Sequence, residues 1–177
     1  MIYLEPDVLG EAAIGRSVDR PDVLATGLRG EVAGLHDALL CADDALDAET
    51  RLAFVVERIR ASFGIDETLA ADLAPPDVAD ALRAFLDTRL FERVTLAEAS
   101  TAVGATPTQA ARAFSTAFGI SPHVYVTGRR LDAARARILD GVPLADVAAS
   151  VGFYDQAHLT RRFKRFLGVT PGRFASR

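Results

Sequence analysis

The chain has 177 residues, half of them hydrophobic, which is enough for one or two domains with a buried core. No apolar run is long enough to predict a membrane span, no signal-peptide pattern is present, and the single cysteine, Cys41, excludes an internal disulfide and fits a reducing cytoplasm. The net charge of −4 is unevenly divided: residues 1–79 carry −10 and residues 80–177 carry +6, so the second half is suited to a polyanionic partner.

The acidic half contains two helical patterns followed by a linker. Apolar residues recur at helical spacing in each pattern: Leu28, Val32, Leu35 and Leu39 in the first, and Leu52, Val55, Val56 and Ile59 in the second. Residues 66–76, which include Pro75-Pro76, are typical of an inter-domain linker.

The basic half contains an internal repeat. Residues 96–104 (LAEASTAVG) recur as residues 144–152 (LADVAASVG), at an offset of 48. A second similar stretch follows each copy, FGISP at 118–122 and LGVTP at 167–171, at an offset of 49. Each copy predicts a short helix, a tight turn and a helix of about twelve residues, which is a helix-turn-helix unit.

Helix-start and helix-stop signals support these units. Five residues are predicted N-caps, four of them with a capping box or a following proline: Thr95, Thr106, Ser121, Asp155 and Thr170. Gly104 and Gly152 stand where each first helix must end in a turn that favours positive φ.

Residues 121–140 predict one continuous helix between the units. Pro122 begins it, Gly141 ends it, and an apolar stripe runs along it at Val124, Leu131, Ala134, Ile138 and Leu139. A connector of about 18 residues is roughly 27 Å long. It is therefore suited to hold two recognition helices about one DNA turn apart.

The second helix of each unit has a face suited to DNA. In the second unit the predicted core face holds Leu159, Phe163, Phe166 and Leu167, and the opposite face holds Gln156, Ala157, Thr160, Arg161 and Lys164. Gln reads adenine and Arg reads guanine in the major groove, while Arg162, Lys164 and Arg165 are expected to reach phosphates. Alternatively, this run of cations merely solvates a surface helix.

In the first unit the predicted core face holds Ala110, Phe114, Ala117 and Phe118, and the opposite face holds Thr108, Arg112 and Ser115, with Ala111 and Thr116 nearby. Arg112 is the one strong base reader in this set. Thr108 and Ala111 are suited to a thymine methyl group, and Thr106 with the helix N-terminus to a phosphate.

These features resemble the DNA-binding domain of the AraC/XylS family of bacterial regulators. The resemblance covers roughly residues 77–177, and its most specific stretches are VAASVGFYDQAHLTRRFK at 147–164 and GVTPGRF at 168–174. It implies an all-α fold in which two helix-turn-helix units are joined by a long helix and preceded by a small helical segment. It also implies a sequence-specific activator that binds double-stranded DNA in adjacent major-groove segments and contacts RNA polymerase.

The resemblance implies a role for the acidic half as well. Residues 1–65 are similar to the helical end of the family's cupin-like sensing domain, with Tyr3-Leu4-Glu5-Pro6 as its last strand. By this resemblance the first apolar stripe either forms a homodimer contact or covers a core; its residues are Leu28, Val32, Leu35 and Leu39. Because the preceding barrel is absent, the chain is interpreted either as a fragment or as a short regulator without an effector pocket.

Other classes of function have weaker support. His36, His123 and His158 are scattered, and no metal-ligand spacing, phosphate-binding loop or nucleophile motif is present, so neither an enzyme nor a cofactor is expected. Two alternatives stay open. One is an interaction module whose N-terminal helices are the functional part, and the other is a small-molecule sensor.

Overall fold

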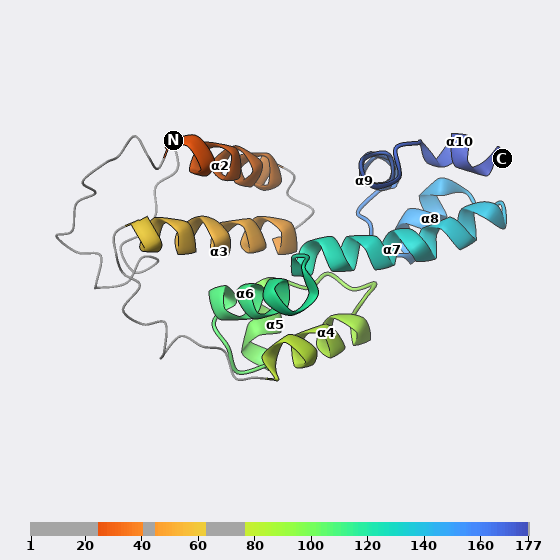
Figure 1. Cartoon of the computed structure of the whole chain (residues 1–177). Coiled ribbons are helices and arrows are strands. Elements are labelled where there is room, and N and C mark those ends of the chain that lie inside the picture. The colour runs from red at the N-terminus through yellow and green to blue at the C-terminus, as the bar shows by residue number, and fades with distance from the viewer. Residues whose placement is uncertain (1–24, 41–44, 63–76, 177) are drawn as a thin grey trace.

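The computed structural model describes residues 25–40, 45–62 and 77–176, and every regular element within these ranges is a helix (Figure 1). The predicted all-α fold is therefore confirmed. The predicted linker at 66–76, the strand-like Tyr3-Leu4-Glu5-Pro6 and Cys41 lie outside the described residues.

Two N-terminal helices form an antiparallel hairpin. They are α2 (Ala25–Leu40) and α3 (Ala45–Ser62), and they lie side by side in Figure 1. Leu35 and Ala38 of α2 and Val55 and Val56 of α3 are buried. An ion pair between Arg58 and Glu31 joins the two helices, with 2.8 Å between Nη1 and Oε1.

The two helix-turn-helix units lie at opposite ends of one long helix. The first contains α4 (Val78–Thr88), α5 (Leu96–Ala102) and α6 (Pro107–Phe118). The connector α7 (Pro122–Leu139) leads to α8 (Leu144–Ser150), α9 (Gln156–Leu167) and α10 (Pro171–Ala175). The predicted connector of about 18 residues is therefore confirmed.

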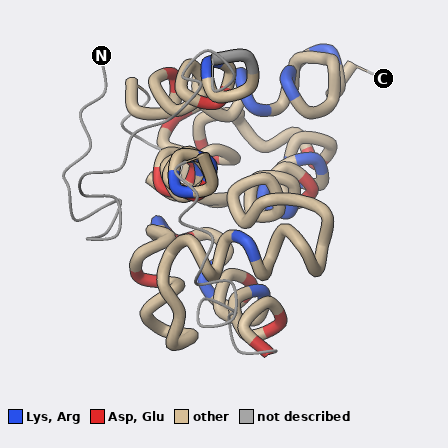
Figure 2. Tube along the Cα trace, turned by 60° about the vertical axis from the view of Figure 1, so that its left-hand side comes forward, with Lys and Arg blue, Asp and Glu red and all other residues tan. Residues whose placement is uncertain are grey.

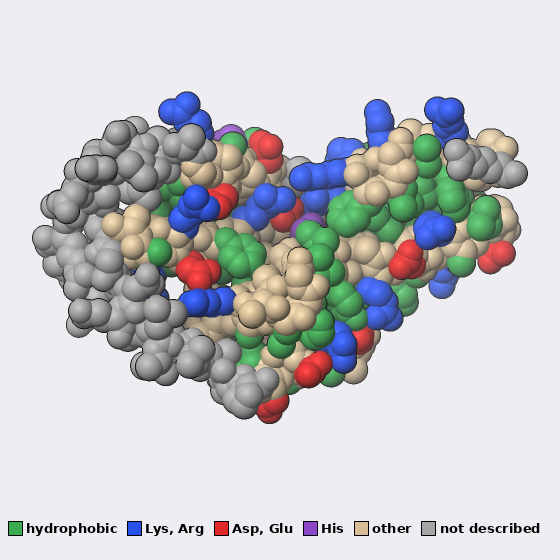
Figure 3. Space-filling model, in the orientation of Figure 1, with side chains coloured by type: hydrophobic (Ala, Val, Ile, Leu, Met, Phe, Trp, Pro, Cys, Tyr) green, Lys and Arg blue, Asp and Glu red, His purple; other side chains and the backbone are tan. Residues whose placement is uncertain are grey.

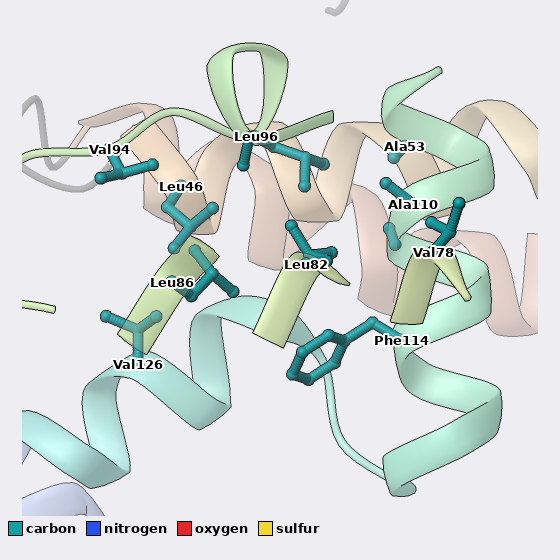
Figure 4. Packing of buried hydrophobic residues seen from close by; sticks show 12 residues of the cluster. Leu46, Ala53, Val78, Leu82, Leu86, Val94, Leu96, Ala110, Phe114 and Val126 are labelled. Atoms are coloured by element: carbon teal, nitrogen blue, oxygen red, sulfur yellow. The ribbon is translucent and has the colours of Figure 1, made fainter. Parts of the chain in front are cut away.

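Each unit has its own hydrophobic core. The first core joins α4, α5, α6 and the start of α7, and it includes Leu82, Leu96 and Phe114 (Figure 4). Leu46 and Ala53 of α3 belong to the same cluster, so the N-terminal hairpin shares this core. The second core is separate and is built around Leu131, Val147, Leu159, Phe163 and their neighbours.

The predicted helix starts are confirmed. Thr95 and Thr106 form complete capping boxes with Glu98 and Gln109, and the side chains of Ser121, Asp155 and Thr170 each accept a hydrogen bond from a backbone N–H in the first turn. Such caps satisfy N–H groups that have no partner within the helix.

The predicted glycine turns are also confirmed. Gly104 has φ +68° and Gly152 has φ +81°. At Gly152 a Cβ atom would lie 2.7 Å from the carbonyl oxygen of Phe91, so this position needs glycine for space as well as for conformation.

Four predicted core residues are exposed instead. Leu139 is 62% exposed, Phe166 and Leu167 are 37% and 38% exposed, and Ala117 is also exposed. All four lie near the C-terminal ends of α6, α7 and α9. Helical spacing alone therefore does not determine which residues near a helix end are covered by neighbouring helices.

Candidate nucleic-acid interface

The recognition helices α6 and α9 occupy equivalent places in the two units. Each runs for 12 residues from a capped N-terminus to a glycine in the left-handed conformation, Gly119 or Gly168. This equivalence follows from the sequence repeat.

In α9 most of the predicted DNA-facing residues are exposed together. Gln156, Ala157, Arg161, Lys164 and Arg165 are exposed, and Thr160 is half-buried. Leu159 and Phe163 lie on the opposite side in the second core, as predicted. Lys and Arg side chains stand out along the upper edge of the C-terminal half in Figure 3. This face therefore presents hydrogen-bonding and cationic groups to solvent.

Arg162 does not lie with that group. Its relative exposure is 9%, and its Nη2 donates to Oδ2 of Asp47 in α3 at 3.1 Å. Its Nε also donates to Nε2 of His158 at 3.3 Å. The structure thus places Arg162 in an ion pair inside the protein, where it cannot reach a phosphate without leaving Asp47.

In α6, which packs against α3, the predicted DNA-facing residues are partly covered. Ala111 is fully buried within the first core, and Thr108 and Ser115 are half-buried, while Thr106 is exposed at the helix start. Arg112 is exposed but pairs with Glu57 of α3, with 3.3 Å between Nη1 and Oε1. The hairpin thus covers the middle of this face.

Asp47 is the centre of the contact between α3 and the C-terminal helices. Its Oδ1 accepts from Nε of Arg51 at 2.6 Å, and its Oδ2 lies 3.1 Å from Arg162 and 3.6 Å from Nε2 of His123. The prediction of DNA-contacting residues missed Asp47 and Glu57. The only sequence signal for these two residues was the opposite charge of the two halves. In the folded chain that division is no longer visible, because acidic and basic residues are interspersed over the described helices in the view of Figure 2.

A polar contact fastens α4 to α7 within the first unit. The Tyr125 hydroxyl donates to Oδ1 of Asp87 at 2.8 Å and accepts from Arg129, which also pairs with Asp87. Burial, reinforced by Asp87, raises the pKa of Tyr125 above its ordinary value.

The residues considered for a dimer contact mostly pack within the hairpin. Leu35 is buried, Leu28 and Val32 are half-buried, and Leu39 is 57% exposed. This arrangement is the one expected if the stripe covers a core in the chain.

The described helices show no sign of two other kinds of site. No three metal-ligating side chains converge within the described ranges. None of the described helices is long and apolar enough to cross a membrane.

Comparison with known proteins finds relatives of the C-terminal part. A family model described as a helix-turn-helix domain matches residues 99–177. The chain is 36% identical over 103 residues to an AraC-like transcription regulator of Streptomyces antibioticus, and 32% identical over 91 residues to the transcriptional regulator LumQ of Photobacterium leiognathi. These alignments cover 58% and 51% of this chain but only 34% and 37% of the relatives, so the chain spans about a third of their length.

A solved structure shows the same fold. The C-terminal domain of AraT, a response regulator from Geobacillus stearothermophilus, superposes with a TM-score of 0.52 at 23% identity, over 58% of this chain and 86% of that domain. The two sequence relatives named here are described as transcription regulators, in agreement with the prediction of a regulator. The C-terminal part of the chain is thus similar to AraC-like transcription regulators, with a helix-turn-helix domain matched at residues 99–177.

Proposed function

We propose that this chain binds specific double-stranded DNA through α6 and α9, which read two adjacent major-groove segments. The observation that carries the proposal is the pair of capped recognition helices at the two ends of the 18-residue α7. A helix of that length is roughly 27 Å long, which is close to one turn of DNA. Residues 77–177 form the DNA-binding domain in this proposal, with 1–65 as the remnant of an effector or dimerisation domain and 66–76 as a linker.

The residues of α9 have distinct roles in this proposal. Gln156 and Arg161, near the exposed N-terminal half of the helix, read base edges, because their side chains make bidentate pairs with adenine and guanine. Lys164 and Arg165 bind phosphates and so fix the register on the duplex.

The first unit contributes less sequence readout. Arg112 is its base reader, and Thr106 at the N-terminus of α6 binds a phosphate. Ala111 and Thr108 offer only small surfaces for a thymine methyl group. For the contacts of Arg112 and Ala111, α3 must first leave the face that it covers.

The proposed effect on transcription rests on the resemblance to the AraC/XylS family. We propose an activator that contacts RNA polymerase while bound to DNA, because the resemblance of residues 77–177 implies that role.

The experiment that tests DNA reading is a selection from random duplexes at about 150 mM salt, near physiological ionic strength. Enrichment of two short motifs about 10–11 base pairs apart is the expected result. One enriched motif would mean that a single unit reads sequence. If no motif is enriched, the proposal fails and the interaction-module alternative gains support.

A further inference from the structure

Helix α3 occupies the surface of α6 that the proposed function assigns to DNA. Ala111 lies in the middle of that surface and is fully buried, in the cluster that contains Leu46 and Ala53 of α3. Arg112 on the same face pairs with Glu57. The contact is therefore apolar at its centre and charged at its edge.

The same helix is also attached to the second unit. The ion pair between Asp47 and Arg162 of α9 is 3.1 Å long, and both side chains are about nine-tenths buried, at 6% and 11% exposure. A cleft between the hairpin and α9 is lined by Asp37, Arg51, Arg161 and Arg165, among others. Two of the cations assigned to DNA therefore face the hairpin across this cleft.

A third contact joins α3 to the short helix α5. The Glu49 side chain accepts a hydrogen bond from the backbone N–H of Ala97, with 2.9 Å between Oε2 and N. Three carboxylates of α3, those of Asp47, Glu49 and Glu57, thus hold both helix-turn-helix units. They contact cationic or N–H groups, as a phosphate backbone would.

The sizes of the partners make hairpin and duplex mutually exclusive at α6. A helix with its side chains is about 10–12 Å across, and the major groove is about 12 Å wide and 8.5 Å deep. The groove therefore accepts α6 alone and excludes α6 with α3 packed on its reading face.

We propose that the α2–α3 hairpin and duplex DNA compete for one surface, and that the chain alternates between the closed form described here and an open form that binds DNA. This inference rests on the proposed function and adds its regulation. The hairpin lowers the apparent DNA affinity by the fraction of molecules that are open, so any change that detaches α3 tightens binding. A signal that acts on the N-terminal half would control DNA binding through this contact.

The test variant changes the hairpin and leaves the DNA surface intact. Ala53→Gln places a long polar side chain where α3 meets the first core, and such overpacking favours detachment. Ala61→Gln is the matched control, because Ala61 is exposed near the end of the same helix. Neither substitution changes the net charge, so long-range attraction to DNA is the same in both.

Two measurements on the full chain decide the proposal. The first is fluorescence anisotropy with a selected duplex: we expect Ala53→Gln to bind about tenfold more tightly than the unmodified chain and Ala61→Gln to match it. The second is amide hydrogen exchange of residues 45–62 in the unmodified chain: we expect saturating duplex to speed it, because α3 is displaced.

Each outcome has a separate meaning. Equal affinities of the two variants, together with unchanged or slower exchange in α3 on DNA binding, would overturn the competition while leaving DNA recognition intact. If Ala53→Gln fails to fold, exchange in the unmodified chain decides alone. Absence of binding by every protein to any duplex would overturn the proposed function and, with it, this inference.

Discussion

Two neighbouring arginines of α9 have opposite environments. Arg161 is exposed, whereas Arg162 is buried against Asp47. Successive side chains on a helix with 3.6 residues per turn point about 100° apart, so one faces solvent while the next faces the protein. The helical wheel predicts the exposure of Arg161. It cannot predict the burial of Arg162, because the partner lies 115 residues away in the sequence.

Arg161→Ala tests the assigned base contact. We expect the substitution to weaken binding to a selected duplex by roughly 1–3 kcal/mol, because a bidentate pair with guanine is lost. The free energy of unfolding should hardly change, since the side chain is exposed. The measurement is anisotropy titration beside urea unfolding. Arg137→Ala removes an exposed arginine from α7 and is the control; an equal loss in both variants would mean that Arg161 supplies charge alone.

Tyr125→Phe tests the contact between α4 and α7. The phenol donates to Asp87, so we expect its loss to lower the free energy of unfolding by about 1 kcal/mol at neutral pH. The pKa of Tyr125 is raised in the folded state. Its contribution to the free energy of unfolding is therefore complete below the unfolded pKa near 10 and is lost as the pH rises through the folded pKa. Urea unfolding between pH 7 and 11 should thus show a smaller alkaline decline in the variant. An identical decline in both proteins would contradict the assignment.

Helix boundaries are the features that the sequence predicted best. The caps at Thr106 and Asp155 depend on residues at most three positions away, so local sequence contains the whole signal. The C-terminal turns of α7 and α9 were predicted less well, because the exposure of Leu139 and Phe166 depends on contacts with other helices. A periodic pattern of apolar residues holds no information about which of them a neighbouring helix will cover.

Asp155→Ala tests how the start of α9 is held. Oδ1 of Asp155 accepts from the N–H of His158 at 2.6 Å, and losing an N-cap of this kind costs about 1 kcal/mol. We expect that loss in urea unfolding, together with weaker DNA binding, because the first turn carries Gln156. Asp132→Ala, at an exposed position of α7 outside any cap, should leave both quantities nearly unchanged. Equal effects of the two substitutions would show that charge, not capping, is what matters.

At the scale of the whole molecule, the sequence predicted the two units and their connector but not the position of the hairpin. The repeat and the caps are local signals, whereas the pair of Glu57 with Arg112 joins segments that no periodicity relates. Opposite charges of the two halves predict attraction, but charge alone does not select α6 as the docking surface. Packing of Ala53 and Leu46 into the first core selects it, and such complementarity is visible only in the folded chain.

One side chain that was not among the predicted functional residues links the two units. Arg130 of α7 donates to the carbonyl oxygens of Leu90 and Glu92, before α5, and of Gly152, in the turn between α8 and α9, at distances of 2.7, 2.6 and 3.0 Å. The planar guanidinium fork supplies these donors in a fixed geometry, which a lysine ammonium cannot reproduce. Arg130 therefore couples the first unit to the turn of the second.

Arg130→Lys should uncouple the units without unfolding them, because each has its own core. Unpaired carbonyl groups at the junction should lower the free energy of unfolding by about 1–3 kcal/mol. Because the spacing of the recognition helices is then less fixed, we expect a smaller penalty for duplexes with one base pair inserted between the half-sites. Anisotropy titrations on a spacing series measure this penalty, with Arg129→Lys as the neighbouring exposed control. A penalty unchanged in Arg130→Lys would mean that α7 alone sets the spacing.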